Sequence, residues 1–119
     1  MRTLVFLGAA ALAAAAASAQ PAEIGYERGA LGFEEMAQGD WSKAEDKLMA
    51  SADELGADPA RLLQLAELYR QTGRADEAET LYREVLGGED KTLVLEDGRV
   101  VTAHNIASMR LSTEMRASR

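Results

Sequence analysis

The chain has 119 residues and a formal net charge of −7, which is enough chain for one small domain. It contains no cysteine, so disulfide bonds and cysteine metal sites are excluded. Nearly all acidic residues precede residue 98, whereas residues 98–119 carry four arginines and one glutamate. Such an acidic body argues against a nucleic acid partner, because phosphate binding needs clustered Lys and Arg.

Residues 1–19 have the pattern of a secretory signal peptide. Arg2 supplies a short positive start, an apolar stretch follows as far as Ala17, and small residues precede the expected cleavage site after Ala19. The alternative is a membrane anchor, but a spanning helix needs roughly 20 apolar residues, and Pro21 closes a shorter stretch. We therefore expect an exported, periplasmic protein with no stable membrane span after cleavage.

Two similar segments lie 34 residues apart in the chain. The first reads MAQGDWSKAEDKL from residue 36, and the second reads YRQTGRADEAETL from residue 69. The residues one period apart are Gly39 and Gly73, Ala44 and Ala78, and Leu31 and Leu65. A period of this length is typical of helical repeats, in which stacked copies bury a shared core.

The second segment predicts two helices joined by a tight turn. Asp58 is expected to cap the first helix, with Pro59 at its first position, where the missing N–H costs nothing. Gly73 allows the turn, and Gly87 and Gly88 end the second helix. One face of the first helix carries Leu62, Leu65, Ala66 and Tyr69, and the facing stripe of the second carries Ala78, Leu81, Tyr82, Val85 and Leu86.

This pattern resembles the tetratricopeptide repeat family, whose helix-turn-helix unit has the same period. The second unit fills the family's pattern positions with Leu62, Leu65, Ala66, Tyr69, Ala78 and Tyr82. In the first unit Arg28 and Glu35 stand where aromatic residues belong, which agrees with the polar outer face of a terminal repeat, and Asp40 should cap the second helix. The resemblance implies a mainly α fold at residues 20–90, with two helix hairpins in a right-handed α-superhelix.

After the repeats, the sequence KTLVLEDGRVVTAH predicts a β-hairpin. Asp97 and Gly98 are typical of a two-residue type I′ turn, which needs positive φ at both central residues. This turn would pair Glu96 with Arg99, Leu95 with Val100, and Val94 with Val101. A C-terminal helix should follow, with a stripe of Ala103, Ala107, Leu111 and Met115. A lone hairpin is marginal in water, so we expect residues 91–119 to cap the open end of the repeats.

The sequence offers no convincing catalytic or cofactor site. His104 is the single histidine, and we interpret it as a helix-start residue near the hairpin. Adjacent carboxylates such as Glu34 and Glu35 point in different directions on a helix, so solvation is their expected role. The Gly-Gly pair after the second repeat lacks the motif of a phosphate loop. We therefore predict that the protein is not an enzyme and binds no cofactor or metal.

The family resemblance implies a protein or peptide partner, because in this family the first helix of each unit lines a concave surface. Transferring the family's positions to this chain gives the surface residues Tyr26, Phe33, Met36, Ala37, Leu63, Gln64, Glu67, Arg70 and Gln71. The lysine and asparagine with which some members clamp a C-terminal carboxylate are replaced by other residues here. A carboxylate clamp of that kind is therefore not expected.

Two functions are left open by these patterns. The first is an exported module that binds a peptide or a partner subunit through this surface. The alternative is a structural, self-associating envelope protein with no separate ligand. In that homo-oligomer, Tyr26 and Phe33 would pack in a dimer seam, and a further option is that they pack against their own chain.

Overall fold

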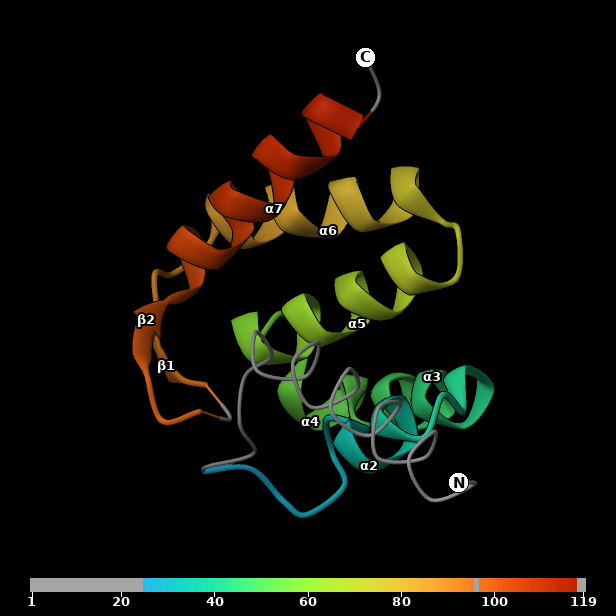
Figure 1. Cartoon of the computed structure of the whole chain (residues 1–119). Coiled ribbons are helices and arrows are strands. Elements are labelled where there is room, and N and C mark those ends of the chain that lie inside the picture. Colours follow the sequence, from blue (N-terminus) through green and yellow to red (C-terminus); the bar gives the residue numbers. More distant parts are fainter. Residues whose placement is uncertain (1–24, 96, 118–119) are drawn as a thin grey trace, which may run out of the picture.

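The fold comes from a computed structural model that describes residues 25–95 and 97–117 (Figure 1). The predicted signal peptide at residues 1–19 lies outside these residues. The elements in chain order are α2 (Phe33–Ala37), α3 (Trp41–Ala50), α4 (Ala52–Leu55), α5 (Pro59–Gln71), α6 (Ala75–Gly87), β1 (Thr92–Val94), β2 (Val100–Thr102) and α7 (Ala103–Ala117). The predicted fold class, helix hairpins followed by a β-hairpin and a C-terminal helix, is confirmed.

The first helix hairpin is shorter than the repeat pattern predicts. Its first helix is only the five residues of α2, because Gly29 and Gly32 take left-handed conformations with φ of 85° and 66° and so prevent an earlier start. Tyr26 consequently lies in the turns before α2 and not on a helix. The second helix, α3, begins as predicted, because Asp40 Oδ1 accepts a hydrogen bond from the backbone N–H of Lys43.

The second helix hairpin, formed by α5 and α6, agrees with its prediction. Asp58 Oδ1 accepts a hydrogen bond of 2.9 Å from the N–H of Ala60, and Pro59 opens α5. Gly73 makes the turn with φ of 79°, and α6 ends at Gly87. The cap and the glycine turn that the sequence shows thus set both ends of α5, whereas α6 ends at Gly87 with Gly88 extended and not left-handed.

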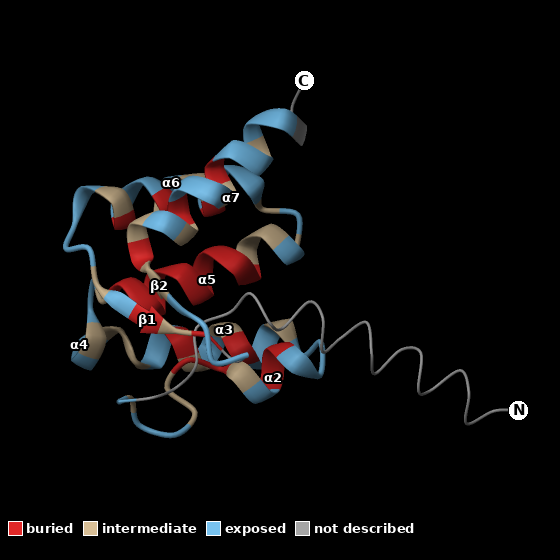
Figure 2. Ribbon diagram, turned by 60° about the vertical axis from the view of Figure 1, so that its left-hand side comes forward, coloured by how far each residue is buried: buried red, intermediate tan, exposed pale blue. Residues whose placement is uncertain are grey.

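The helix α5 lies at the centre of the fold, with α3 on one side and α6 and α7 on the other (Figure 2). Every residue from Pro59 to Leu68 is buried. One core cluster joins α5 to α6, β1, α7 and Leu31. The second cluster joins α5 to α2 and α3, and it consists of Met36, Ala44, Leu48, Leu65 and Leu68. The two clusters make α5 the element that holds both hairpins together.

The β-hairpin forms, but its predicted register is wrong by one residue. The paired residues are Thr92 and Thr102, Leu93 and Val101, and Val94 and Val100. The N–H of Leu95 donates to the carbonyl of Arg99 at 2.8 Å, so the turn has three residues and not two. Gly98, with φ of 88°, fits the left-handed position of such a turn. The side chain of Arg99 binds Asp97 at 2.6 Å instead of the predicted Glu96, which lies outside the described residues.

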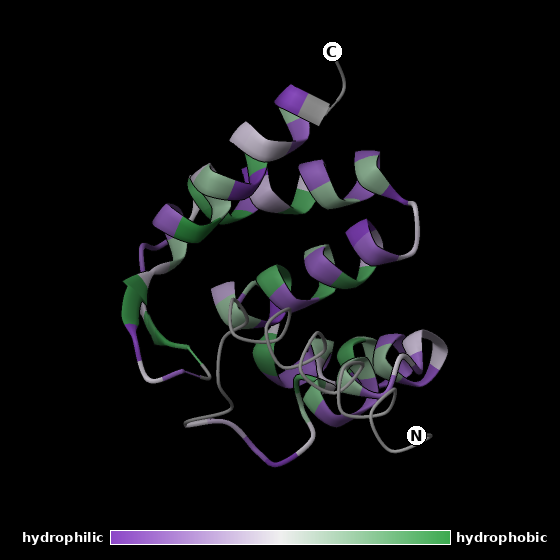
Figure 3. Ribbon diagram, viewed as in Figure 1, coloured by the Kyte–Doolittle hydropathy of each residue, from purple (hydrophilic) through white to green (hydrophobic). Residues whose placement is uncertain are grey.

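The C-terminal helix α7 closes the open end of the second helix hairpin, as predicted. It packs along α6 and also contacts α5. Ala103, Ala107 and Leu111 are buried in one core with Leu93 of β1, and the strands and the start of α7 form a largely hydrophobic corner (Figure 3). Met115, the fourth residue of the predicted stripe, is exposed, because the last turns of α7 project past α6 (Figure 1).

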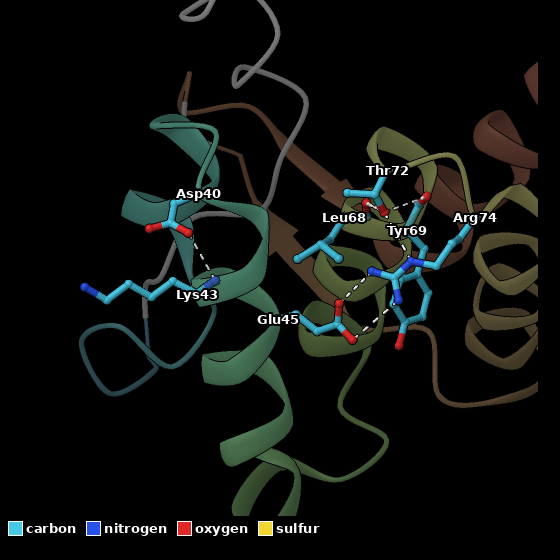
Figure 4. A network of polar contacts seen from close by, with 7 residues as sticks. All are labelled: Asp40, Lys43, Glu45, Leu68, Tyr69, Thr72 and Arg74. Atoms are coloured by element: carbon cyan, nitrogen blue, oxygen red, sulfur yellow. Dashed lines mark hydrogen bonds and ion pairs between the residues drawn. The ribbon is translucent and has the colours of Figure 1, made fainter.

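An ion pair joins the turn between α5 and α6 to α3 (Figure 4). Arg74 donates to the two carboxylate oxygens of Glu45 at 2.6 and 3.4 Å, and its Cζ lies 4.2 Å from the ring centroid of Tyr69. Arg74 Nε also donates to the hydroxyl of Thr72, which in turn donates to the carbonyl of Leu68. The turn of the second hairpin is thereby attached to the first hairpin.

We expect a double-substitution cycle of Arg74→Ala and Glu45→Ala to give a coupling of about 0.5–1 kcal/mol in the free energy of unfolding. The two side chains are 34% and 32% exposed, so water screens much of their attraction. Urea unfolding of the two single variants and the double variant measures the coupling. It should shrink at about 1 M salt, and a coupling of zero at low salt would contradict the role given to this pair.

Candidate functional site

The predicted concave surface divides into buried and accessible residues. Met36, Leu63, Gln64 and Glu67 are all buried. The expectation that these four side chains face solvent is therefore wrong. The physical reason is that α5 is enclosed by α3, α6 and α7, while Met36 packs into the cluster between the two helix hairpins.

Tyr26 is half-buried and is held by its own chain. Its hydroxyl donates to Asp58 Oδ1 at 2.9 Å and accepts a hydrogen bond from Lys91 Nζ at 2.8 Å. Lys91 also forms an ion pair of 3.0 Å with Asp58. Burial, together with the negative charge of Asp58, raises the pKa of Tyr26, so its hydroxyl stays protonated. Tyr26 thus connects three segments, which agrees with the option that it packs against its own chain.

The remaining residues of the predicted surface are at least partly accessible. Phe33 is half-buried and packs on the main core cluster. Ala37 and Gln71 are exposed, and about a quarter of the Arg70 side chain is exposed. These four residues stay candidates for contact with a partner. Phe33 and Ala37 are the first and last residues of α2, and Arg70 and Gln71 are the last two residues of α5.

Glu67 organises a polar network at the last turns of α5. Arg70 donates to both of its carboxylate oxygens, with Nε–Oε2 at 3.0 Å and Nη2–Oε1 at 2.7 Å. Gln71 Nε2 donates to Glu67 Oε1 at 3.2 Å. Arg110 of α7 completes the network, with its Nη2 3.5 Å from Glu67 Oε2. One buried carboxylate thus orients two guanidinium groups from different helices.

The network keeps Glu67 ionised despite its burial. Desolvation by itself would raise the pKa of this carboxyl, but the hydrogen bonds from Arg70 and the positive charges of Arg110 and Arg70 outweigh it and hold the pKa below the usual value. Burial and the charge of Glu67 raise the pKa of the neighbouring Tyr82. The site therefore holds one carboxylate, two guanidinium groups and a neutral phenol at neutral pH.

The middle of this chain matches a known protein family. Residues 35–92 match a family model described as tetratricopeptide repeat. This segment is similar to the tetratricopeptide repeat family. No curated protein and no solved structure matches the chain. Tetratricopeptide repeats are protein–protein interaction modules and not enzymes, so the family indicates a protein partner.

Arg110 is the residue of the network that sequence reasoning missed. It lies on α7, beyond the tetratricopeptide repeat segment, beside the buried stripe residues Ala107 and Leu111. The only sequence signal was the excess of arginine in this otherwise acidic chain after residue 98. Its partner Glu67 is remote in sequence, so the contact depends on how α7 packs on α5.

Three other features of the described residues concern metal ligands, the single histidine and membrane-spanning helices. Within residues 25–95 and 97–117, no group of three or more His, Asp or Glu side chains could hold a metal ion. His104 lies in the first turn of α7, with its ring nitrogen Nε2 2.9 Å from the carbonyl oxygen of Gly88, and its backbone N–H donates to Asp90. The interpretation of His104 as a helix-start residue is confirmed. None of the described helices is long and apolar enough to cross a membrane.

Proposed function

We propose that this protein is an exported interaction module that binds a peptide or a partner subunit at the last turn of α5. The observation that carries the proposal is the network around Glu67. It fixes Arg70 in one orientation, part-exposed, in a repeat family that binds proteins. Such preorganisation lowers the entropy lost when a side chain makes contact with a partner.

The export part of the proposal rests on residues 1–19, whose charge and apolar pattern are those of a secretory signal. An exported, cysteine-free repeat module would hold its fold by packing alone, in a compartment where disulfide bonds are common. Fractionation of cells that express the tagged full chain tests this part. Recovery of the shortened chain with the periplasmic fraction is expected, and retention of an unshortened chain in the cytoplasm would contradict it.

A photo-crosslinking amino acid at Gln71 tests the binding site. Gln71 is exposed and adjoins Arg70, so irradiation in an envelope extract should join a partner protein to the chain. The matched control is the same group at Arg83, which is exposed on α6. We expect a specific product from position 71 and none of that mass from position 83.

The masses of the products also separate the two functions. A product that contains a different protein supports the interaction module. A product with the mass of two copies of this chain would favour the self-associating structural protein. Equal labelling from both positions, or no product from position 71 at any extract concentration, would contradict the proposed surface.

A further inference from the structure

A cavity of about 150 Å³ lies where the β-hairpin meets α7. The hairpin contributes Leu95 and Arg99 to its walls, and α7 contributes Ile106, Met109, Arg110 and Thr113. The four α7 residues follow the spacing of one helix face. The cavity lies beyond the residues that match the tetratricopeptide repeat, so the repeat pattern itself does not predict it.

The size and walls of the cavity fit one apolar side chain. A cavity of about 150 Å³ lined by aliphatic and aromatic groups is large enough for benzene. Leu95, Ile106 and Met109 supply the apolar walls here, and Met109 is 66% exposed. A flexible methionine at the opening lets the cavity adapt to a leucine or an aromatic ring.

Two guanidinium groups border this apolar space. The side chain of Arg99 is 62% exposed and forms an ion pair with Asp97, with Nε 2.6 Å from Oδ2. Arg110 lies 3.5 Å from Glu67. A guanidinium group has five N–H donors, so both arginines retain donors for a further carboxylate. Arg110 also links the cavity to the network at the end of α5.

We propose that this cavity binds a leucine-sized or aromatic side chain of a partner protein segment, and that Arg99 and Arg110 bind an Asp or Glu next to that side chain. The two charged side chains in the described lining are arginines, and the donors that they keep beyond Asp97 and Glu67 favour a carboxylate on the partner. This assignment rests on the proposed interaction function and adds a partner chemistry to it, an apolar residue flanked by carboxylates.

Three capped peptides test the assignment by titration into the isotope-labelled full chain, followed by backbone amide NMR. The first has the sequence Gly-Glu-Leu-Glu-Gly, the second replaces both Glu by Lys, and the third replaces Leu by Ala. The first peptide should shift the amides of Leu95, Arg99, Ile106 and Met109. The other two should bind at least about tenfold more weakly. Equal binding of the three peptides, or shifts confined to other parts of the chain, would overturn the assignment.

Two variants of the lining are matched with two controls on α7. Met109→Trp should fill the cavity and Arg99→Glu should reverse its charge, and each should weaken the first peptide about tenfold or more. Met115→Trp and Arg116→Glu make the same chemical changes at exposed residues outside the lining, and they should leave the affinity unchanged. Peptide binding that survives both Met109→Trp and Arg99→Glu would overturn the assignment.

The same spectra distinguish a partner from a second copy of this chain. If dilution of the chain alone moves the same amides, and sedimentation shows a dimer, the occupant is another copy and the partner assignment fails. If the crosslinker at Gln71 captures a protein while the first peptide does not bind, the interaction function stands and the cavity assignment alone is wrong.

Discussion

Replacing Leu68 by Ala is expected to lower the free energy of unfolding by about 2–5 kcal/mol. Leu68 is fully buried in the cluster that joins α5 to α2 and α3. Removing most of its side chain leaves a cavity between two helix hairpins, and the neighbouring helices can close it only partly. Urea unfolding followed by circular dichroism measures the loss.

The control for this experiment is Met49→Ala on α3. More than half of Met49 is exposed, so its truncation should change the free energy of unfolding by no more than about 0.5 kcal/mol. Similar losses from Leu68→Ala and Met49→Ala would show that packing between the two helix hairpins does not carry the stability assigned to it.

The second large effect is expected for Glu67→Gln, which should lower the free energy of unfolding at neutral pH by about 1.5–3 kcal/mol, the range for hydrogen bonds to charged groups. The substitution keeps the size of the side chain but removes the negative charge that Arg70 and Arg110 share. Glu79→Gln, in the exposed pair with Arg83, is the matched control and should cost no more than about 0.5 kcal/mol.

The effect of Glu67→Gln should disappear in acid. The folded chain holds the pKa of Glu67 below its usual value. Its carboxylate therefore adds stability above the unfolded-state pKa of about 4.3 and loses that contribution as the pH falls through the folded-state pKa. The unfolding free energies of the wild type and of Glu67→Gln should converge as the pH falls below about 4. A difference that stays constant from neutral pH into acid would contradict the network.

The second helix hairpin could be predicted from the sequence because local chemistry sets its ends. Asp58 and Pro59 open α5 through a cap and a fixed φ angle, and Gly73 supplies the positive φ of the turn. None of these effects needs a distant partner. The first hairpin was predicted less well, because its residues match the repeat positions while Gly29 and Gly32 shorten the helix.

The register of the β-hairpin could not be predicted, because the packing of α7 decides it. Ala103 begins α7 directly after β2 and is fully buried. Val101, two residues earlier, therefore lies on the inner face opposite Leu93. The predicted two-residue turn would have shifted the pairing by one residue and turned Val101 outward. The core thus overrides the turn preference of Asp97 and Gly98.

The candidate site was predicted only in part for a similar reason. Gln64 and Glu67 are polar, and polar residues on a helix mostly face water. Here Gln64 is fully buried. Glu67 can be buried because Arg110 of α7 supplies a second positive charge beside its carboxylate. Arg70 and Gln71, which the family positions place on the surface, are accessible at the end of α5. The enclosure of its middle depends in part on α7, which lies outside the repeat.

The contact of Tyr26 with Lys91 affects how the protein unfolds. Repeat proteins whose units touch only their neighbours can lose structure stepwise from one end. Here Tyr26 and Lys91 are both bonded to Asp58, and Leu31 shares a core with Leu93. The first and last described segments therefore hold each other in place. Heat should melt residues 25–117 in one cooperative transition, and cutting the chain before the β-hairpin should loosen the first segment as well as the last.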